Sequence, residues 1–233
     1  MPKFPADPTP YPPFAASEIK LERARGFINE LKRELERYRA SNPLTPTFET
    51  HVTPPQIRIE HTAIGLLPGA IIGDAIHNLR TTLDLMASEL ARIKFKSDSD
   101  VYFPFAENEE TLEAAIKSKC FQKAGEDAVT LLKEIRPYRG GNDMLRAIHD
   151  LDIQDKYTAL PVTLGHFKVK LSASYNIDVP FENTITITSA EIDYLFWEGT
   201  VLNGTKCVES LEQLVEIVSR VLKAFAGLVA ARA

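Results

Sequence analysis

The sequence predicts an α+β protein: mainly a helical bundle, with a small antiparallel β-sheet towards the C-terminal half and a long C-terminal amphipathic helix that closes the fold. Apolar residues recur at alternating spacings of three and four over residues 17–39, 70–93 and 208–231, a period typical of helices with one buried face. After Pro161 the period changes to two, which is typical of antiparallel strands. The composition, 44% hydrophobic and 25% charged, is that of a globular protein.

The chain is predicted to divide into a short arm and one domain. Residues 1–16 contain six prolines, whose fixed φ angles and missing N–H groups favour an extended arm over a helix. Residues 17–233 are predicted to form a single α+β domain. It consists of a helical core over 17–160, strands within 162–204 and the helix over 208–231.

The first helix is predicted over residues 17–39, with Ser17 as its N-cap. One buried stripe is expected to contain Leu21, Ala24, Ile28, Leu31, Leu35 and Tyr38. The other positions mix acidic and basic residues, and such a mixed face is typical of a surface in contact with water. The helix is therefore expected at the edge of the bundle, with one face on the core.

The remaining elements are predicted from changes of period and from Gly and Pro residues. They are a hairpin over 47–52 and 56–63, a helix from Pro68 to Lys94, helices over 109–118 and 125–135, a helix from Asn142 or Asp143 to Leu160, strands over 167–171, 184–188, 194–197 and 199–202, and the C-terminal helix. Trp197 is expected in the core of the sheet, and the segment around Tyr102–Phe105 is predicted as a loop.

Charge, cysteines and the N-terminus exclude several classes of protein. A net charge of −5 argues against wholesale binding of duplex nucleic acid, which favours a basic face. Cys120 and Cys207 lie far apart and outside any metal spacing, so both are expected to be reduced. The first residues do not resemble a secretory signal, and no apolar stretch is long enough for a membrane span. The expectation is a cytoplasmic protein without a membrane partner or a cofactor.

The helix over residues 70–93 is predicted to bury two faces. One is an aliphatic seam of Ile72, Ile76, Leu79, Leu83, Met86, Leu90 and Ile93. The opposite face combines small residues with three ionisable residues: Ala70, Gly73, Ala87, Ser88 and Ala91 with His77, Arg80 and Asp84. Small side chains allow a second helix to approach closely, from the same chain or from a partner. A homo-oligomer formed through the small-residue face of this helix is therefore predicted.

The helix over residues 143–160 carries a matching signal. Asp152 and Asp155 project onto the same side as its apolar core residues, with His149 and Lys156 at the edge. A buried carboxylate without a partner is costly, so each of these acids needs a cation or strong hydrogen bonds. Residues of helix 70–93 are the best candidates. The sequence thus predicts that the two helices face each other through a polar seam of His77, Arg80, Asp84, His149, Asp152, Asp155 and Lys156.

Two interpretations of this polar seam are open. It is either a network of ion pairs that fixes the register of the two helices, or the lining of a functional crevice. For metal binding, Asp74-x-x-His77 and His149-x-x-Asp152 have a suitable spacing on a helix, but further ligands are not apparent and no metal site is predicted. The His149-Asp150 doublet is similar to that of HD-type phosphohydrolases, without the other residues of that pattern.

A separate turn offers a phosphate-binding hypothesis. Arg136, Tyr138 and Arg139 form a small basic and aromatic patch between two predicted helices. Arg136 and Arg139 could grip a phosphate group, and the alternative is a capped turn without a ligand. Glycine-rich phosphate loops, dinucleotide fingerprints, zinc clusters and nucleophile elbows are absent from the sequence.

The pattern Gly73-Asp74-x-x-His77-Asn78-Leu79-Arg80-x-x-Leu83-Asp84, with Asp152-x-x-Asp155-Lys156 after it, resembles a family of uncharacterised bacterial and phage proteins. More distantly, the His-Asn-Leu-Arg helix is similar to helices of HEPN-type modules, which often dimerise and cleave RNA. That similarity implies catalytic roles for His77, Arg80 and Asp84. However, HEPN nucleases place their Arg four to six residues before the His, whereas His77 precedes Arg80.

The leading functional hypothesis from the sequence is a self-associating or partner-binding helical module. One alternative is a HEPN-like, metal-independent ribonuclease of a defence or toxin–antitoxin system, in which RNA would be the substrate. The other alternative is a metal-binding helical hydrolase.

Overall fold

The computed structural model of the chain describes residues 11–49, 56–95, 100–157, 162–174 and 184–231. In this part of the chain the elements are α1 (Ala15–Ala40), β1 (Leu44–Glu49), β2 (Gln56–His61), α2 (Leu67–Phe95), α3 (Leu112–Ser118), the 3₁₀ helix η1 (Phe121–Ala124), α4 (Glu126–Ile135), α5 (Asp143–Tyr157), β3 (Val162–Ser174), β4 (Thr184–Phe196) and α6 (Cys207–Ala230). The α+β class predicted from the sequence is confirmed.

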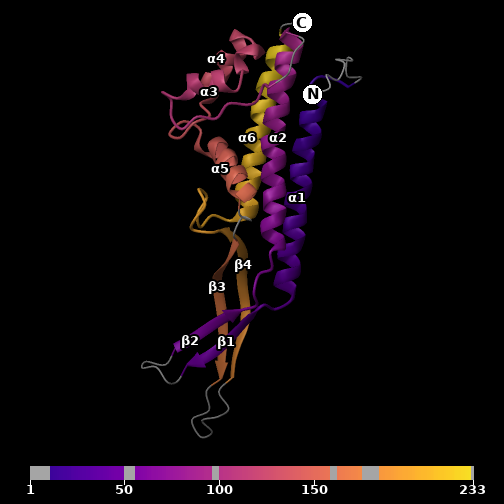
Figure 1. The fold of residues 1–233 in the computed structure, drawn as a ribbon. Helices are drawn as coiled ribbons and strands as arrows, with labels where there is room; N and C mark the ends of the chain where they lie inside the picture. The colour runs from indigo at the N-terminus through magenta and orange to yellow at the C-terminus, as the bar shows by residue number, and fades with distance from the viewer. Residues whose placement is uncertain (1–10, 50–55, 96–99, 158–161, 175–183, 232–233) are drawn as a thin grey trace.

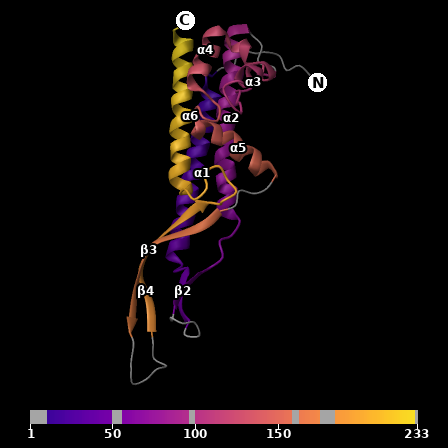
Figure 2. The ribbon, with the colours of Figure 1, turned by 90° about the vertical axis from the view of Figure 1, so that its left-hand side faces the viewer.

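Three long helices, α1, α2 and α6, lie side by side and form the bundle (Figures 1 and 2). The central helix is α2, which packs against both of the others. Its predicted seam is fully buried from Ile72 to Leu90, because a spacing of three and four keeps these residues on one face. Ile93 is the exception: it lies in the last turn of α2 and is exposed.

The start of α1 differs from the prediction. The helix begins at Ala15, its N-cap is Phe14 in the left-handed region (φ 65°), and Ser17 is buried inside the first turn. Ser17 therefore does not cap the helix. The chain enters through a turn in which the Ala15 N–H donates to the Pro12 carbonyl, and the buried Phe14 ring packs on the core. The predicted arm over residues 1–16 is therefore too long by two residues, because Ala15 and Ala16 belong to α1, and its residues 1–10 lie outside the described residues.

The C-terminal helix α6 closes the bundle as predicted. Its apolar face, from Leu211 to Phe225, is buried against α1 and α2. Cys207 at its start is buried, Cys120 is half-buried, and both are free thiols. Burial raises the pKa of the Cys207 thiol well above its usual range.

A layer of shorter helices covers one side of the bundle (Figure 1). The helices α3 and α4 correspond to the predicted helices over 109–118 and 125–135, and the sequence reading missed η1 between them. Asn142 caps α5, because its Oδ1 accepts a hydrogen bond from the Leu145 N–H (3.1 Å). The last described residue of α5 is Tyr157, and residues 158–160 of the predicted helix lie outside the described residues.

Among the residues that the structure describes, the strands form two antiparallel pairs, β1 with β2 and β3 with β4, and not one sheet. β1 pairs with β2, and β3 pairs with β4 with Val162 opposite Phe196 and a register shift between Phe167 and Lys170. Because β1 also contacts β4, the two hairpins extend together from one end of the bundle (Figures 1 and 2). From here on, the arm means these two hairpins, and not the N-terminal segment of residues 1–16. Residues 50–52 of the predicted first hairpin lie outside the described residues.

The predicted strand over 199–202 does not form. Residues 197–205 are a series of turns, in which the Thr200 N–H donates to the Trp197 carbonyl and Gly204 adopts φ 70°. Trp197 is 49% exposed and lies outside the core that was expected for it. The short alternation of apolar and polar residues suggested a strand, but the two glycines of this segment favour turns.

A group of charged side chains joins the arm to the bundle. Arg39, at the end of α1, donates from Nε to the Ile192 carbonyl of β4 (2.8 Å), and its Nη2 lies 3.3 Å from Asp193 Oδ1. Lys206, which precedes α6, lies 3.0 Å from Asp193 Oδ2. We call Arg39, Asp193 and Lys206 the arm joint. None of the helices in the described part of the chain is long and apolar enough to cross a membrane.

Candidate functional site

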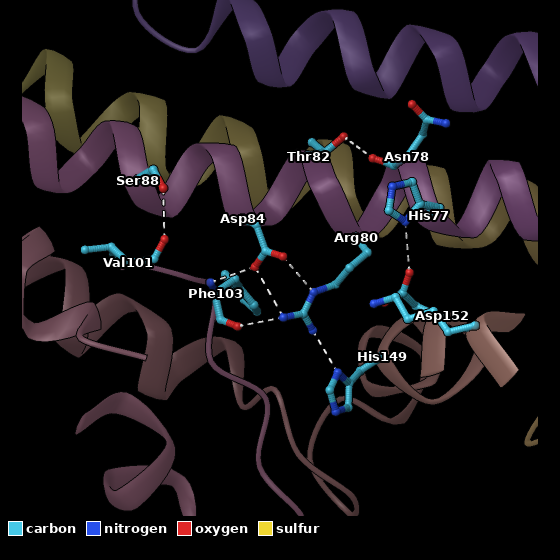
Figure 3. Close-up of polar contacts among 11 residues, drawn as sticks. His77, Asn78, Arg80, Thr82, Asp84, Ser88, Val101, Phe103, His149 and Asp152 are labelled. Carbon is cyan, nitrogen blue, oxygen red and sulfur yellow. Dashed lines mark hydrogen bonds and ion pairs between the residues drawn. The ribbon is translucent and has the colours of Figure 1, made fainter. Parts of the chain in front are cut away.

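The polar seam lies between α2 and α5 (Figure 3). The two helices run in opposite directions, as the order of their contacts shows. Arg80 contacts His149, His77 contacts Asp152 one turn further down α2, and Gly73 lies against Asp155 one turn beyond that. Lys156 completes the group through Asp152. The structure therefore brings together all seven residues that the sequence placed in the seam.

Arg80 makes most of the contacts in the half of the polar seam that lies towards the C-terminal end of α2. Its Nε lies 3.0 Å from Asp84 Oδ2 and its Nη2 lies 3.2 Å from Asp84 Oδ1, a bidentate pair between residues four apart on α2. Arg80 also donates to the Phe103 carbonyl (3.4 Å) and to His149 Nδ1 (2.8 Å), and the Phe105 ring lies 4.5 Å from the guanidinium carbon. With its side chain only 10% exposed, Arg80 is occupied by partners within the chain.

His149 is neutral in this setting. Burial, followed by the nearby charges of Arg80 and Arg146, lowers the pKa of His149 from 6.5 to about 4. A neutral imidazole that accepts at Nδ1 carries its proton on Nε2, so the Arg80 contact sets the tautomer. The ring stacks on Phe105 with centroids 5.2 Å apart and 12° between the planes. His149 thus acts here as a hydrogen-bond acceptor for a buried cation.

Asp84 also fixes the segment between α2 and α3. Its Oδ1 accepts a hydrogen bond from the Phe103 N–H (2.9 Å), and Ser88 one turn later donates to the Val101 carbonyl (2.9 Å). Both contacts place the chain from Val101 to Phe105 on the small-residue face of α2 (Figure 3). The sequence predicted this segment only as a loop. The one signal for its role was its aromatic content, since Phe103 and Phe105 are buried.

The other half of the polar seam, towards the N-terminal end of α2, contains His77, Asp152 and Lys156. Asp152 is buried, and its two carboxylate oxygens lie 3.2 Å from His77 Nδ1 and 2.6 Å from Lys156 Nζ. The His77 side chain is 57% exposed, and Lys156 is exposed to a similar degree. A buried carboxylate therefore orients an imidazole whose ring opens to solvent.

At Gly73 the two helices approach closely. A Cβ atom built on Gly73 would lie 2.2 Å from Asp155 Oδ1, far inside van der Waals contact. The absence of a side chain at this position lets the Asp155 carboxylate lie directly against α2. Asp155 has an interaction partner of its own within the chain.

Two details of the predicted seam need correction. His77 and Arg80 were the expected partners of Asp152 and Asp155: His77 contacts Asp152, whereas Arg80 pairs with Asp84 and His149 instead. From Gly73 onwards the small residues on this face of α2 are covered by α5, η1 and the segment from Val101 to Phe105, all of the same chain, while Ala70 is exposed. Ala87 and Ala91 on this face are fully buried within one chain, so a second copy is not needed to cover them.

The residues of the metal and phosphohydrolase alternatives do not converge. Asp74 is exposed on α2, and Asp150 turns to Arg146 (2.9 Å) and Arg139 (3.0 Å), away from the seam. Burial raises the pKa of Asp150 in spite of these two cations. Among the residues that the structure describes, no group of three or more His, Cys, Asp or Glu side chains is placed to hold a metal ion.

The two arginines of the phosphate-binding hypothesis have different surroundings. Arg139 pairs with Glu107 (2.7 Å) and Asp150 (3.0 Å), so acids already neutralise its charge. Arg136, at the C-cap of α4, donates from Nε to the Tyr138 hydroxyl (2.9 Å) and lines a groove beside α6. A second large groove, of about 710 Å³, follows the outer face of α1 around Ile19 and lies on another side of the molecule from the polar seam.

Comparison of the chain with known protein families, with curated proteins and with solved structures found no match.

Proposed function

We propose that this chain is a non-catalytic helical module that self-associates through an apolar surface at the foot of the bundle, where the arm begins. To this surface we assign six exposed large apolar side chains, a set that we call the foot surface: Leu66, Leu67, Ile153, Tyr157, Trp197 and Val201. Leu66 is 86% exposed and Tyr157 84% exposed, and a patch of such exposed apolar side chains is typical of an interaction surface.

The contacts within the chain support the grouping of these residues. Because α5 runs down α2 towards its start, Tyr157 at the end of α5 comes level with the first turn of α2. Phe196 pairs with Val162, which follows α5 by a few residues, so the turn that contains Trp197 lies nearby. In both ribbon views the start of α2, the end of α5 and the turn after β4 gather at the same end of the bundle (Figures 1 and 2).

The electrostatics of the polar seam support a structural role for it. Asp84 is paired with Arg80, and Asp152 is paired with His77 and Lys156. A phosphate group would therefore meet carboxylates that are already paired within the chain and an arginine that is already bound four times. The seam is better suited to joining two helices than to holding a nucleic acid.

Sedimentation velocity over a concentration series tests self-association. We expect the wild type to show a monomer–dimer equilibrium, and Leu66→Ser/Tyr157→Ser to weaken it about tenfold or more, because large apolar side chains dominate interface energies. The control is Ile19→Ser/Tyr102→Ser, which removes two exposed apolar side chains outside the foot surface. A wild type that stays monomeric at every concentration, or a control as disruptive as the foot variant, would contradict the proposal.

One observation favours a second candidate, a HEPN-like ribonuclease as the similarity of the His-Asn-Leu-Arg helix implies. The exposed His77 imidazole on the buried Asp152 has the arrangement of a general base held by a carboxylate. In that case His77, Asp152 and Lys156 would act, and the occupied Arg80 and Asp84 would not. Cleavage of a structured RNA by the wild type and by His61→Ala, but not by His77→Ala, would replace the first proposal with this one.

A further inference from the structure

A groove lies between the turn that joins α4 to α5 and the neighbouring face of α6. Its volume is about 670 Å³, within the range of small-molecule pockets. The lining includes apolar side chains of three elements, among them Ile135, Met144, Ile217 and Val221. None of these residues belongs to the polar seam or to the foot surface, so the groove is a separate feature of the molecule.

Two arginines lie at the rim of this groove, Arg136 and Arg220. Both are exposed, and the side-chain hydrogen bonds described for them use the Nε atoms: Arg136 to the Tyr138 hydroxyl (2.9 Å) and Arg220 to the Glu216 carbonyl (3.4 Å). The Tyr138 contact raises the pKa of Arg136, so the guanidinium is charged at any physiological pH. A guanidinium has further N–H donors on its two Nη atoms, which suit a carboxylate or a phosphate.

Two acids, Asp143 and Glu134, line the groove together with the two arginines, so the formal charges of the lining cancel. Asp143 already accepts a hydrogen bond from the Gly140 N–H (2.7 Å) within the turn. Glu134, at the end of α4, is the other acid of the lining. The backbone at Arg136 is also unusual, because it is in the left-handed region (φ 56°) at a helix C-cap, where glycine is the ordinary residue. The chain has an arginine there despite the conformational cost.

We propose that this groove binds a small amphipathic anion, whose carboxylate or phosphate is held by Arg136 and Arg220 and whose apolar body lies against Ile217 and Val221. The proposal combines the volume of the groove, its apolar lining and the two guanidiniums at its rim. It does not depend on the function of the foot surface or of the polar seam.

Isothermal titration calorimetry with octanoate, octyl phosphate and octanol tests this proposal. We expect saturable one-site binding of at least one anion, with octanol at least about tenfold weaker, because hydrogen bonds to a charged group are stronger than those to a neutral hydroxyl. The ratio of the affinities for octanoate and octyl phosphate identifies the preferred headgroup. Binding of neither anion, or equal binding of octanol, would overturn the proposal.

Three variants locate the binding site. Arg136→Gln/Arg220→Gln removes the two charges, and Ala224→Phe fills the groove from an exposed position on α6. Both should weaken anion binding at least about tenfold while the melting temperature stays near that of the wild type. The matched control is Arg33→Gln, at an exposed position of α1 outside the groove, and it should bind like the wild type. Anion binding that survives both groove variants would show that the site lies elsewhere.

Discussion

At Gly73 the Asp155 carboxylate occupies the space that a Cβ atom would need. We expect Gly73→Ala to lower the free energy of unfolding by about 1–3 kcal/mol, the usual cost of overpacking. This loss should outweigh the gain of about 1 kcal/mol that alanine offers over glycine in a helix. Urea denaturation followed by circular dichroism measures the difference.

Gly26 provides the matched control for this substitution. It lies on the exposed side of α1, and nothing lies within 4 Å of the position of its Cβ. Gly26→Ala should therefore stabilise the protein by about 0.5–1 kcal/mol. If Gly73→Ala stabilised the protein as well, α2 and α5 would not approach as closely as described. Asp155→Ala introduced together with Gly73→Ala should recover part of the loss by removing the steric conflict.

His149 makes the stability of the fold depend on pH. Its pKa is lowered from 6.5 to about 4, so between these values the unfolded chain binds a proton that the folded chain does not. The stability that neutral His149 contributes is present above pH 6.5 and is lost as the pH falls towards 4. We expect this loss to be about 1–2 kcal/mol, reduced from the full shift because the ring is partly open to solvent.

The control for the pH effect is His149→Gln, whose amide oxygen can accept the hydrogen bond from Arg80 but does not titrate. Melting temperatures measured between pH 7 and pH 4 should fall less steeply for this variant than for the wild type. Carboxylates titrate in both proteins, so the comparison isolates the imidazole. Parallel curves would mean that His149 has an ordinary pKa in the folded protein.

Among the elements, α2 and α5 were the most predictable. The spacing of Ile72, Ile76 and Leu79 fixes one face of α2, and the ionisable residues on the other face indicated a polar neighbour. Asp152 on the apolar side of α5 indicated where that neighbour lies, because a buried carboxylate needs a partner. Periodicity and the cost of buried charge were enough to place the two helices against each other.

The partners of Arg80 could not be predicted in the same way. Two of them, the Phe103 carbonyl and the Phe105 ring, belong to a segment whose apolar residues have no regular spacing. The sequence therefore does not predict where this segment packs. Its position follows from the Phe103 N–H bond to Asp84, a contact between residues 19 apart in the sequence. The same limit explains the error at Trp197, since a short alternating run cannot distinguish a strand from consecutive turns.

On the scale of the whole molecule, the arm joint determines how the hairpins are held relative to the bundle. Asp193 is largely buried and links Arg39 of α1 to Lys206 at the start of α6. We expect Asp193→Ala to widen the range of arm orientations, because both cations lose their shared partner. Double electron–electron resonance between nitroxides introduced with Arg33→Cys and Lys170→Cys, in a Cys120→Ser background, should show a broader distance distribution.

The matched control for the arm joint is Glu191→Ala, which removes an exposed ion pair with Lys168 on the same arm. It should leave the distance distribution unchanged. If Asp193→Ala gave the same narrow distribution as the control, the packing of β1 on β4 would be sufficient to hold the arm, and the arm joint would be dispensable.

The order of the bundle helices in the sequence has a consequence for synthesis on the ribosome. The aliphatic seam of α2 is buried against both α1 and α6, and α6 is the last helix to be synthesised. While residues 100–206 are being translated, side chains such as Leu83 and Met86 have only one of their two long helical neighbours. We therefore expect the nascent chain to expose an apolar surface until α6 emerges, the kind of surface that chaperones bind during translation.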